Sequence, residues 1–225
     1  MQIRKDSLTN NSYFHIFSRS IAKYKIFNNE KEYLRFLELL QLYRFKNFNH
    51  KYSKYLELDL KSQKTTIENL KNQNLVLVEI VAYCIMPTHV HLLLKQIDNQ
   101  GISKFISKVF NSYARYFNFK HHRTGPLWAG RFKNVLVSKD EQLLHLTRYI
   151  HLNPASAGLV KRPNDWVFSS YLEYIDKGSE KDAICSTRNL FSISPKEYKK
   201  FVLDQKSYQR DLAKIKSYLF DSYTG

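Results

Sequence analysis

This sequence has little cysteine, a shortage of acidic residues and no long apolar run. Its two cysteines, Cys84 and Cys185, are too few for a disulfide framework, and Cys84 lies in an apolar run that suits a reduced thiol. The longest apolar run, 75–86, is interrupted by Glu79 and is too short to cross a bilayer. Residues 1–12 are polar and lack the apolar core of a signal peptide. We therefore expect an intracellular protein that stays out of the membrane.

Positive charge is what the chain has in excess. Its 36 lysine and arginine residues outnumber 20 aspartate and glutamate residues, for a formal net charge of +16 and a pI near 9.7. An excess of this size favours a polyanionic partner, most simply nucleic acid. An anionic membrane surface is the competing interpretation, but no basic helix with a clean apolar face accompanies the charge. The 43% hydrophobic and 15% aromatic content indicates a folded globule.

Hydrophobic periodicity predicts the fold. Strand-like runs lie at 13–19, 75–86, 89–95 and 131–137, and helical spacing recurs at 33–43, 103–119 and 140–152. This β-α-β-β-α-β order, followed by a further helix, is the split βαβ arrangement of ferredoxin-like domains. We therefore expect an α+β protein with an antiparallel sheet, helices on one face of it and a C-terminal helical tail.

Local signals predict where two of these helices begin and end. Asn28 and Asn29 offer a cap for the first helix, and 138–141 has the pattern of a capping box for the last. Pro154 disfavours helical geometry at Asn153, so the last helix should end near there.

Two segments stand apart from this core. Residues 47–74 are rich in lysine and asparagine with weak periodicity, and form either an inserted helix or a mobile excursion. Residues 176–180 have the composition of a linker. We therefore predict a catalytic domain over 1–175 and an extension over 176–225 that carries helical patterns at 198–202 and 212–219.

His89 and His91 are separated by one residue within a strand-like run. Side chains alternate across a strand, so both imidazoles should leave the same face while Val90 leaves the other. Two convergent neutral imidazoles are half of a divalent-metal site. The alternative is a pair of solvent-facing histidines on a half-exposed strand.

The helix that begins at Asp140 supplies a second half for such a site. On a helical wheel Tyr149 and Asn153 share one narrow sector, one turn apart, beside an apolar sector that should pack on the sheet. The Asn153 amide oxygen is a third donor for a divalent ion, and a phenol beside a metal is a competent nucleophile. The shared sector also holds Gln142 and His145, and the apolar sector holds Leu143, Leu146 and Ile150.

Other roles for these tyrosines compete with catalysis. Tyr149 alone is equally compatible with an amphipathic aromatic at the edge of the core. Tyr113 and Tyr116 lie on the apolar stripe of their own helix, so we assign both to packing.

Several short motifs follow one another in a fixed order. They occupy 13–15 with Arg19, 86–93, 125–133, 149–154, 157–160 and 166–171. Their order and spacing resemble the single-tyrosine HUH transposases, in particular the branch of REP-associated tyrosine transposases, akin to insertion-sequence 200/605 enzymes. The resemblance spans roughly residues 12–174. The segment 47–74 is longer than a minimal member has, and the tail after Asp176 has no part in the catalytic motif.

The resemblance implies roles for individual residues. His89 and His91 fall on the HUH pair that holds Mg²⁺ or Mn²⁺, Asn153 on a third ligand that bears an amide, and Tyr149 on the nucleophile. It also implies cleavage and rejoining of single-stranded DNA near hairpins through a covalent 5′-phosphotyrosine, in a bacterial cytoplasm and in association with the nucleoid. Relatives work as dimers or as monomers, so a homodimer and a monomer both stay open.

Basic residues that bracket an aromatic residue are our candidates for DNA contact, because cations hold phosphates while an aromatic ring stacks on unpaired bases. The aromatic residue is Trp128, and the basic residues around it are Lys120, Arg123, Arg131 and Lys133, with His121 and His122 in the same loop. Arg19 is a further candidate outside this loop. The alternative is that Trp128 packs and the charges are only solvated.

Two other classes of function compete with a transposase. A non-catalytic nucleic-acid-binding module of ferredoxin-like fold would leave the histidine pair and the Tyr149–Asn153 pairing as coincidences. A metal nuclease that activates water would keep the site but give Tyr149 no covalent role. A large separation between Tyr149 and the two histidines would favour the binding module.

Overall fold

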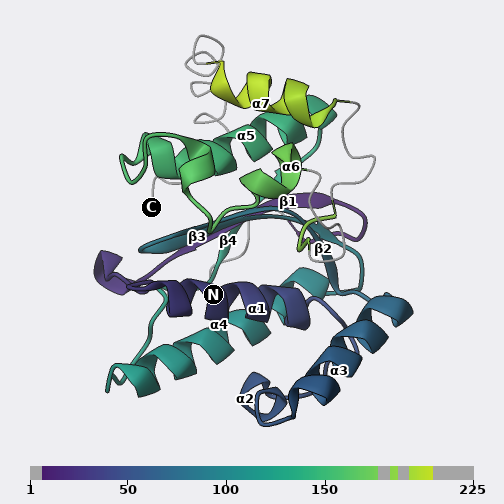
Figure 1. Cartoon of the computed structure of the whole chain (residues 1–225), viewed down its shortest axis with the longest axis vertical. Helices are drawn as coiled ribbons and strands as arrows, with labels where there is room; N and C mark the ends of the chain where they lie inside the picture. Colours follow the sequence, from purple (N-terminus) through teal and green to yellow (C-terminus); the bar gives the residue numbers. More distant parts are fainter. Residues whose placement is uncertain (1–6, 177–182, 187–192, 205–225) are drawn as a thin grey trace.

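A four-stranded antiparallel sheet forms the middle layer of this computed structural model, which describes residues 7–176, 183–186 and 193–204 (Figure 1). The strands are β1 (Tyr13–Arg19), β2 (Val78–Met86), β3 (His89–Gln96) and β4 (Lys133–Val137). They lie in the spatial order β2-β3-β1-β4, with β1 antiparallel to both β3 and β4. This order confirms the predicted ferredoxin-like sheet.

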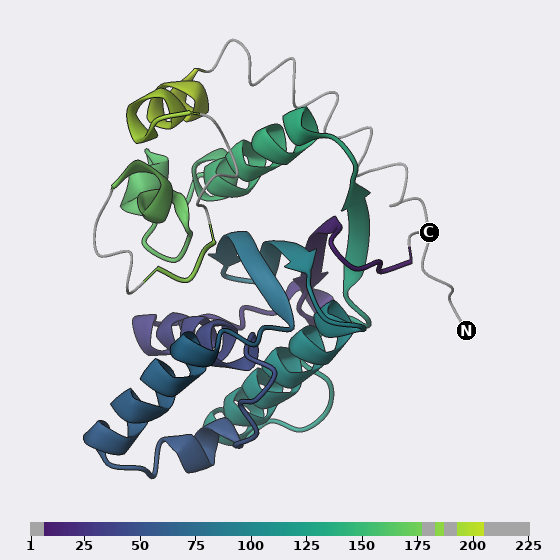
Figure 2. The same ribbon diagram turned by 90° about the vertical axis from the view of Figure 1, so that its right-hand side faces the viewer.

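Helices cover both faces of the sheet (Figures 1 and 2). On one face lie α1 (Glu30–Tyr43) and α4 (Gly101–Lys120), and on the other lie α5 (Asp140–Ser156), α6 (Tyr171–Ile175) and α7 (Pro195–Leu203). Short 3₁₀ turns occupy Ile21–Lys23 (η1) and Pro163–Asp165 (η2).

The prediction placed helices on one face of the sheet, and α1 and α4 do share a face. It did not include the second layer, in which α5 covers the opposite face. That second face is apolar and needs cover, because burying its carbon surface is favourable. The strand residues that α5 covers are Val81, Ala82, Cys84, Met86 and Leu93. Leu143, Leu146 and Ile150 of α5 pack against them, as the helical wheel predicts.

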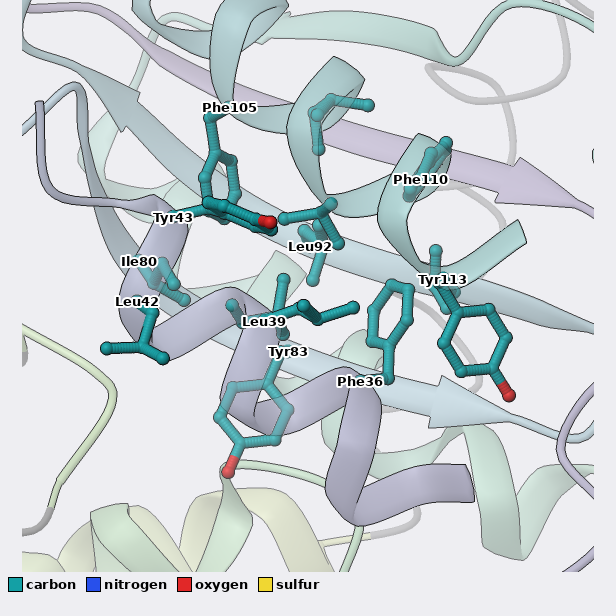
Figure 3. Close-up of a cluster of buried hydrophobic side chains, with 14 of the residues drawn as sticks. Phe36, Leu39, Leu42, Tyr43, Ile80, Tyr83, Leu92, Phe105, Phe110 and Tyr113 are labelled. Atoms are coloured by element: carbon teal, nitrogen blue, oxygen red, sulfur yellow. The ribbon is translucent and has the colours of Figure 1, made fainter. Parts of the chain in front are cut away.

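The main core lies between the sheet and the pair α1 and α4. Figure 3 shows Phe36 of α1 beside Tyr113 of α4, and Leu39 of α1 near Leu92 of β3. Tyr113 is fully buried in this core and donates a hydrogen bond to the Ile26 carbonyl at 2.6 Å. The packing role predicted for Tyr113 is confirmed.

The predicted helix ends were right for α1 and wrong for α5. Asn29 caps α1, its side chain accepting a hydrogen bond from the Glu32 backbone N–H. Helix α5 has Lys139 at its N-cap without a side-chain cap, and it continues through Pro154 to Ser156. One more turn is possible because Ala157 N–H bonds to the Asn153 carbonyl at 2.9 Å and the proline ring is buried.

The segment 47–74 is helical, which is the first of the two alternatives raised above. It contains α2 (Tyr52–Tyr55) and α3 (Leu60–Gln73). Tyr52, Tyr55 and Leu70 are buried as part of the main core, so the segment is integrated with the rest of the domain.

The C-terminal extension is partly described. Helix α7 confirms the helical pattern at 198–202, whereas residues 177–180 and the pattern at 212–219 lie outside the described residues. Tyr198 and Val202 of α7 pack against Tyr171 and Tyr174 of α6.

The described residues include both cysteines and the helices that bear on the expectation about the membrane. Cys84 and Cys185 are both buried and free. Among the described helices, none combines the length and apolar character that a membrane crossing requires.

Candidate active site

A pocket of about 370 Å³ lies where β1 and β3 face α5. It is lined by His15, Phe17, Ser18, Arg19, Lys23, Thr88, His89, Val90, His91, Tyr149 and Asn153. The predicted metal ligands and the predicted nucleophile therefore share one cavity.

Strand alternation explains why the histidines face α5. On β3, Val90 and Leu92 belong to the main core, so the side chains between them point to the other face. His91 projects from that other face, and Leu93 packs against α5 from it. Strand β1 is the neighbour of β3, and its His15 joins the same pocket. The predicted convergence of the histidine pair is confirmed.

Hydrogen bonds fix the orientation of both imidazoles. The ring centroids of His89 and His91 lie 5.1 Å apart. Thr88 Oγ1 lies 3.0 Å from His89 Nδ1, and His15 Nε2 lies 3.0 Å from His91 Nδ1. Because Nδ1 is engaged in each ring, Nε2 is the nitrogen left to face a ligand.

Burial keeps all three imidazoles neutral. Desolvation lowers the pKa of His15 to about 3, and it also lowers the pKa of His89. The pKa of His91 lies well below its ordinary value, chiefly through burial and further through its two histidine neighbours. A neutral imidazole has the lone pair that a metal ion requires, so the histidines are in the ligating form at neutral pH.

Helix α5 brings Tyr149 to the histidines. The Tyr149 ring centroid lies 5.8 Å from that of His91 and 6.2 Å from that of His15, with the rings nearly perpendicular. Asn153 follows one turn later, and its Nδ2 donates to the Tyr149 carbonyl at 3.0 Å. The separation that would favour a binding module is therefore not observed.

The donor set fits a divalent cation. Within the described parts of the chain, no group of three His, Cys, Asp or Glu side chains is arranged to hold a metal ion. The pocket offers the Nε2 atoms of His89 and His91 and the Asn153 amide oxygen as donors to a metal ion. The Asn153 amide nitrogen is not one of them, because it donates a hydrogen bond to the Tyr149 carbonyl. None of these donors carries a negative charge, so a cation held here would keep its charge for a phosphate.

Sequence reasoning missed four polar residues that line the pocket, namely His15, Ser18, Lys23 and Thr88. His15 had a usable signal, because it lies in a predicted strand and alternates with the apolar residues Phe14 and Ile16. Lys23 had none, because its position depends on the turn that follows β1.

The predicted DNA-contact residues are spread over several environments. Arg19 is exposed and lines the pocket. Lys120 lies 2.8 Å from the buried carboxylate of Glu32. Arg123 donates to Asn118 Oδ1 at 2.9 Å, and its guanidinium lies over the Tyr24 ring. Arg131 and Lys133 are exposed near the start of β4, and their contact with DNA stays a prediction.

Trp128 has the packing role that was the alternative to base stacking. Its ring stacks on Phe110 with centroids 4.1 Å apart, and its Nε1 donates to the Phe110 carbonyl. We therefore leave Trp128 out of the DNA contacts proposed below.

The chain belongs to the IS200-like transposase family, whose model matches residues 9–153 and so includes every residue that lines the pocket. Two curated relatives carry the name REP-associated tyrosine transposase. The protein of Haemophilus influenzae is 30% identical over 103 residues, which are 41% of this chain and 58% of the relative. The protein of Escherichia coli is 28% identical over 104 residues, 44% of this chain and 58% of the relative.

A solved structure has the same fold. It is described as a REP-associated tyrosine transposase bound to a REP hairpin, and it aligns with a TM-score of 0.53 at 15% identity. The alignment covers 87% of this chain and 96% of that one. At this identity the likeness shows the fold alone.

Proposed function

We propose that this chain is a metal-dependent transposase that cleaves and rejoins single-stranded DNA near hairpins, with Tyr149 as the nucleophile. The observation that supports this most directly is the convergence of Tyr149 with His89 and His91 in one pocket. The hairpin as partner is supported by the solved relative, which is described as bound to a REP hairpin. One chain supplies all of these side chains.

The reaction begins with attack of the Tyr149 oxygen on the scissile phosphorus. A bond forms between this oxygen and the phosphorus while the bond from phosphorus to the 3′ oxygen breaks. The phenolic proton is lost and the leaving oxygen gains one, so a strand ending in a 3′-hydroxyl departs. The protein keeps the 5′-phosphate as phosphotyrosine. Because this linkage conserves the energy of the phosphodiester, a 3′-hydroxyl can reverse the step without ATP.

His89, His91 and Asn153 are the residues that would hold Mg²⁺ or Mn²⁺, which when bound would polarise the phosphate and offset charge that grows on its oxygens. Thr88 and His15 keep the two imidazoles oriented through their Nδ1 atoms. Arg19 adds a positive charge at the pocket for the DNA backbone.

Adduct formation tests the proposal. A suicide oligonucleotide with a hairpin and a single-stranded flank, incubated with Mg²⁺ or Mn²⁺, should yield a covalent protein–DNA band with the wild-type chain. Tyr149→Phe should yield none, because it lacks the attacking oxygen. Retained cleavage in Tyr149→Phe would favour a hydrolytic nuclease, and cleavage by no variant would favour a binding module.

His89→Ala tests whether cleavage and hairpin binding depend on different residues. We expect it to abolish cleavage and leave hairpin binding nearly unchanged, because affinity comes from phosphate contacts with basic side chains. A gel-shift titration beside the cleavage assay measures both. A binding loss as large as the loss of activity would contradict this division of roles.

A further inference from the structure

The turn after β1 holds two consecutive residues in a conformation that only glycine adopts readily. Ala22 has φ 51° and ψ 26°, and Lys23 has φ 56°. A side chain at positive φ is strained, and such strain persists only where surrounding contacts determine the conformation. Strained backbone gathers at functional sites, so this turn is a candidate for a role beyond connecting β1 to α1.

Hydrogen bonds on both sides determine the conformation of this turn. Ser20 N–H donates to the Thr88 carbonyl at 2.8 Å, and Ser20 Oγ donates to the Tyr24 carbonyl at 2.5 Å. Ile21 N–H donates to the Leu127 carbonyl at 2.9 Å, and Ile26 N–H to the Pro87 carbonyl at 2.9 Å. The turn is therefore tied to residues 87–88, which connect β2 to β3.

The same connection orients a predicted metal ligand. Thr88, whose carbonyl holds the turn, also places its hydroxyl 3.0 Å from His89 Nδ1. Lys23 lines the pocket together with His89 and Tyr149. The strained turn and the imidazole are thus fixed relative to each other through one short piece of backbone.

Lys23 adds a positive charge to this pocket. The lining contains two cationic side chains, Arg19 and Lys23, and no carboxylate. In the portions of the chain that the structure describes, neither of the two forms a salt bridge. With two cationic side chains and no carboxylate in its lining, the cavity has a net positive charge. An anion is the ligand class that such a cavity favours.

We propose that Lys23 binds the scissile phosphate, its ammonium group donating to a non-bridging oxygen as Tyr149 attacks. This inference rests on the proposed function and adds a residue that touches the reacting phosphate. A hydrogen-bond donor that is positioned before the reaction stabilises negative charge that develops in the transition state. The strained turn would serve to position the Lys23 side chain in this way. No new bond is made or broken by Lys23.

The first test compares cleavage rates. Lys23→Gln should cleave the hairpin oligonucleotide about 100-fold more slowly than wild type, which is the usual cost of one lost donor to a developing oxyanion. Lys23→Arg should retain most of the rate because it keeps the charge. The matched control is Lys25→Gln, since Lys25 is exposed two residues further on and does not line the pocket. Unchanged thermal unfolding of each variant shows that the fold is intact.

The second test asks which phosphate Lys23 contacts. The adduct maps the cleaved linkage, and an oligonucleotide with a neutral methylphosphonate at that linkage removes its charge. On a Tyr149→Phe background, which prevents cleavage, Lys23→Gln should weaken binding of the all-phosphate strand by about tenfold and leave binding of the methylphosphonate strand unchanged. Lys25→Gln should affect both strands equally.

The outcomes distinguish failure of the Lys23 inference from failure of the proposed function. If Lys23→Gln cleaves as fast as Lys25→Gln, or weakens both strands equally, Lys23 is no ligand of the scissile phosphate. If wild type forms no adduct at all, the proposed function fails and the Lys23 inference fails with it.

Discussion

Among single side chains, His15 controls how His91 presents its ring. Its Nε2 lies 3.0 Å from His91 Nδ1, and its own Nδ1 is buried without a hydrogen-bond partner in the described structure. For His91 Nε2 to offer a lone pair, His91 must carry its proton on Nδ1 and donate it to His15. A ligand imidazole oriented by such a partner is a better base and is held in place.

We predict that His15→Phe weakens Mn²⁺ binding by about 10- to 100-fold, because the acceptor for His91 Nδ1–H is lost. Titration of Mn²⁺ followed by electron paramagnetic resonance measures the affinity without DNA. His15→Gln is the control, since its amide oxygen can accept the same bond. Equal affinities for wild type and His15→Phe would show that His91 needs no such partner.

At the scale of elements, α5 carries Tyr149, the proposed nucleophile, and packs against α7. His151 of α5 lies 2.7 Å from the Tyr198 hydroxyl through Nδ1 and 2.8 Å from Ser170 Oγ through Nε2. The Tyr198 hydroxyl also donates to Thr147 Oγ1 at 2.9 Å. Arg148 is buried between its neighbours and donates to the Asp204 carbonyl, just beyond α7. Residues on both sides of Tyr149 are therefore anchored to the C-terminal extension.

Tyr198→Phe should lower the free energy of unfolding by about 1–3 kcal/mol, because it leaves polar atoms of His151 and Thr147 buried with one partner fewer. Urea unfolding followed by circular dichroism measures the change. Tyr24→Phe removes a hydroxyl from an exposed ring and should change stability little. If Tyr198→Phe lowers the free energy of unfolding no more than Tyr24→Phe does, the hydrogen bonds of Tyr198 do not stabilise α5.

The same network makes stability depend on pH. Burial lowers the pKa of His151 to about 3, whereas an unfolded histidine binds its proton near pH 6.5. Below pH 6.5 the unfolded chain takes up a proton that the folded chain does not. The stability present above pH 6.5 is therefore lost as pH falls toward 3, by about 1.4 kcal/mol per pH unit for each such histidine.

We predict that His151→Gln makes the free energy of unfolding depend less steeply on pH than in the wild type. The two slopes should differ by the amount that corresponds to about one proton. Urea unfolding at a series of pH values measures both slopes. The comparison belongs between pH 6 and 4, where the two states differ most in proton binding. Identical slopes for the two proteins would show that His151 titrates alike in the folded and unfolded states.

At the scale of the whole molecule, the excess of positive charge should govern DNA affinity. With a net charge of +16, binding through phosphate contacts releases counterions, so affinity falls as salt rises. About four contacts to a single strand predict roughly 50-fold weaker binding at 200 mM than at 50 mM salt. Fluorescence anisotropy of a labelled hairpin measures it.

Arg19→Gln should reduce the slope of log affinity against log salt by about 0.7, the value for one contact to a single strand. A salt dependence that is flat for the wild-type chain would contradict the proposed basic surface. A slope unchanged in the variant would remove Arg19 from the contacts.

Local pattern predicted most elements of the fold. Strand β1 has the bounds that its residues predicted, and Asn29 caps α1. The predicted end of α5 at Asn153 was wrong, because burial and later backbone bonds let the helix pass Pro154. The placement of α5 on the second face could not be predicted from one helix alone, since it depends on which sheet face is left uncovered.

The sequence by itself determined which side chains share a face. Alternation sends His89 and His91 in one direction, and the helical period stacks Tyr149 on Asn153, because both rules act over a few residues. Only the tertiary structure decided that these two faces meet, with the rings of His91 and Tyr149 5.8 Å apart. It also placed Lys23 in their pocket. Those distances depend on the pairing of β1 with β3 and on the packing of α5 across the sheet, and no local pattern encodes contacts between segments so far apart in the chain.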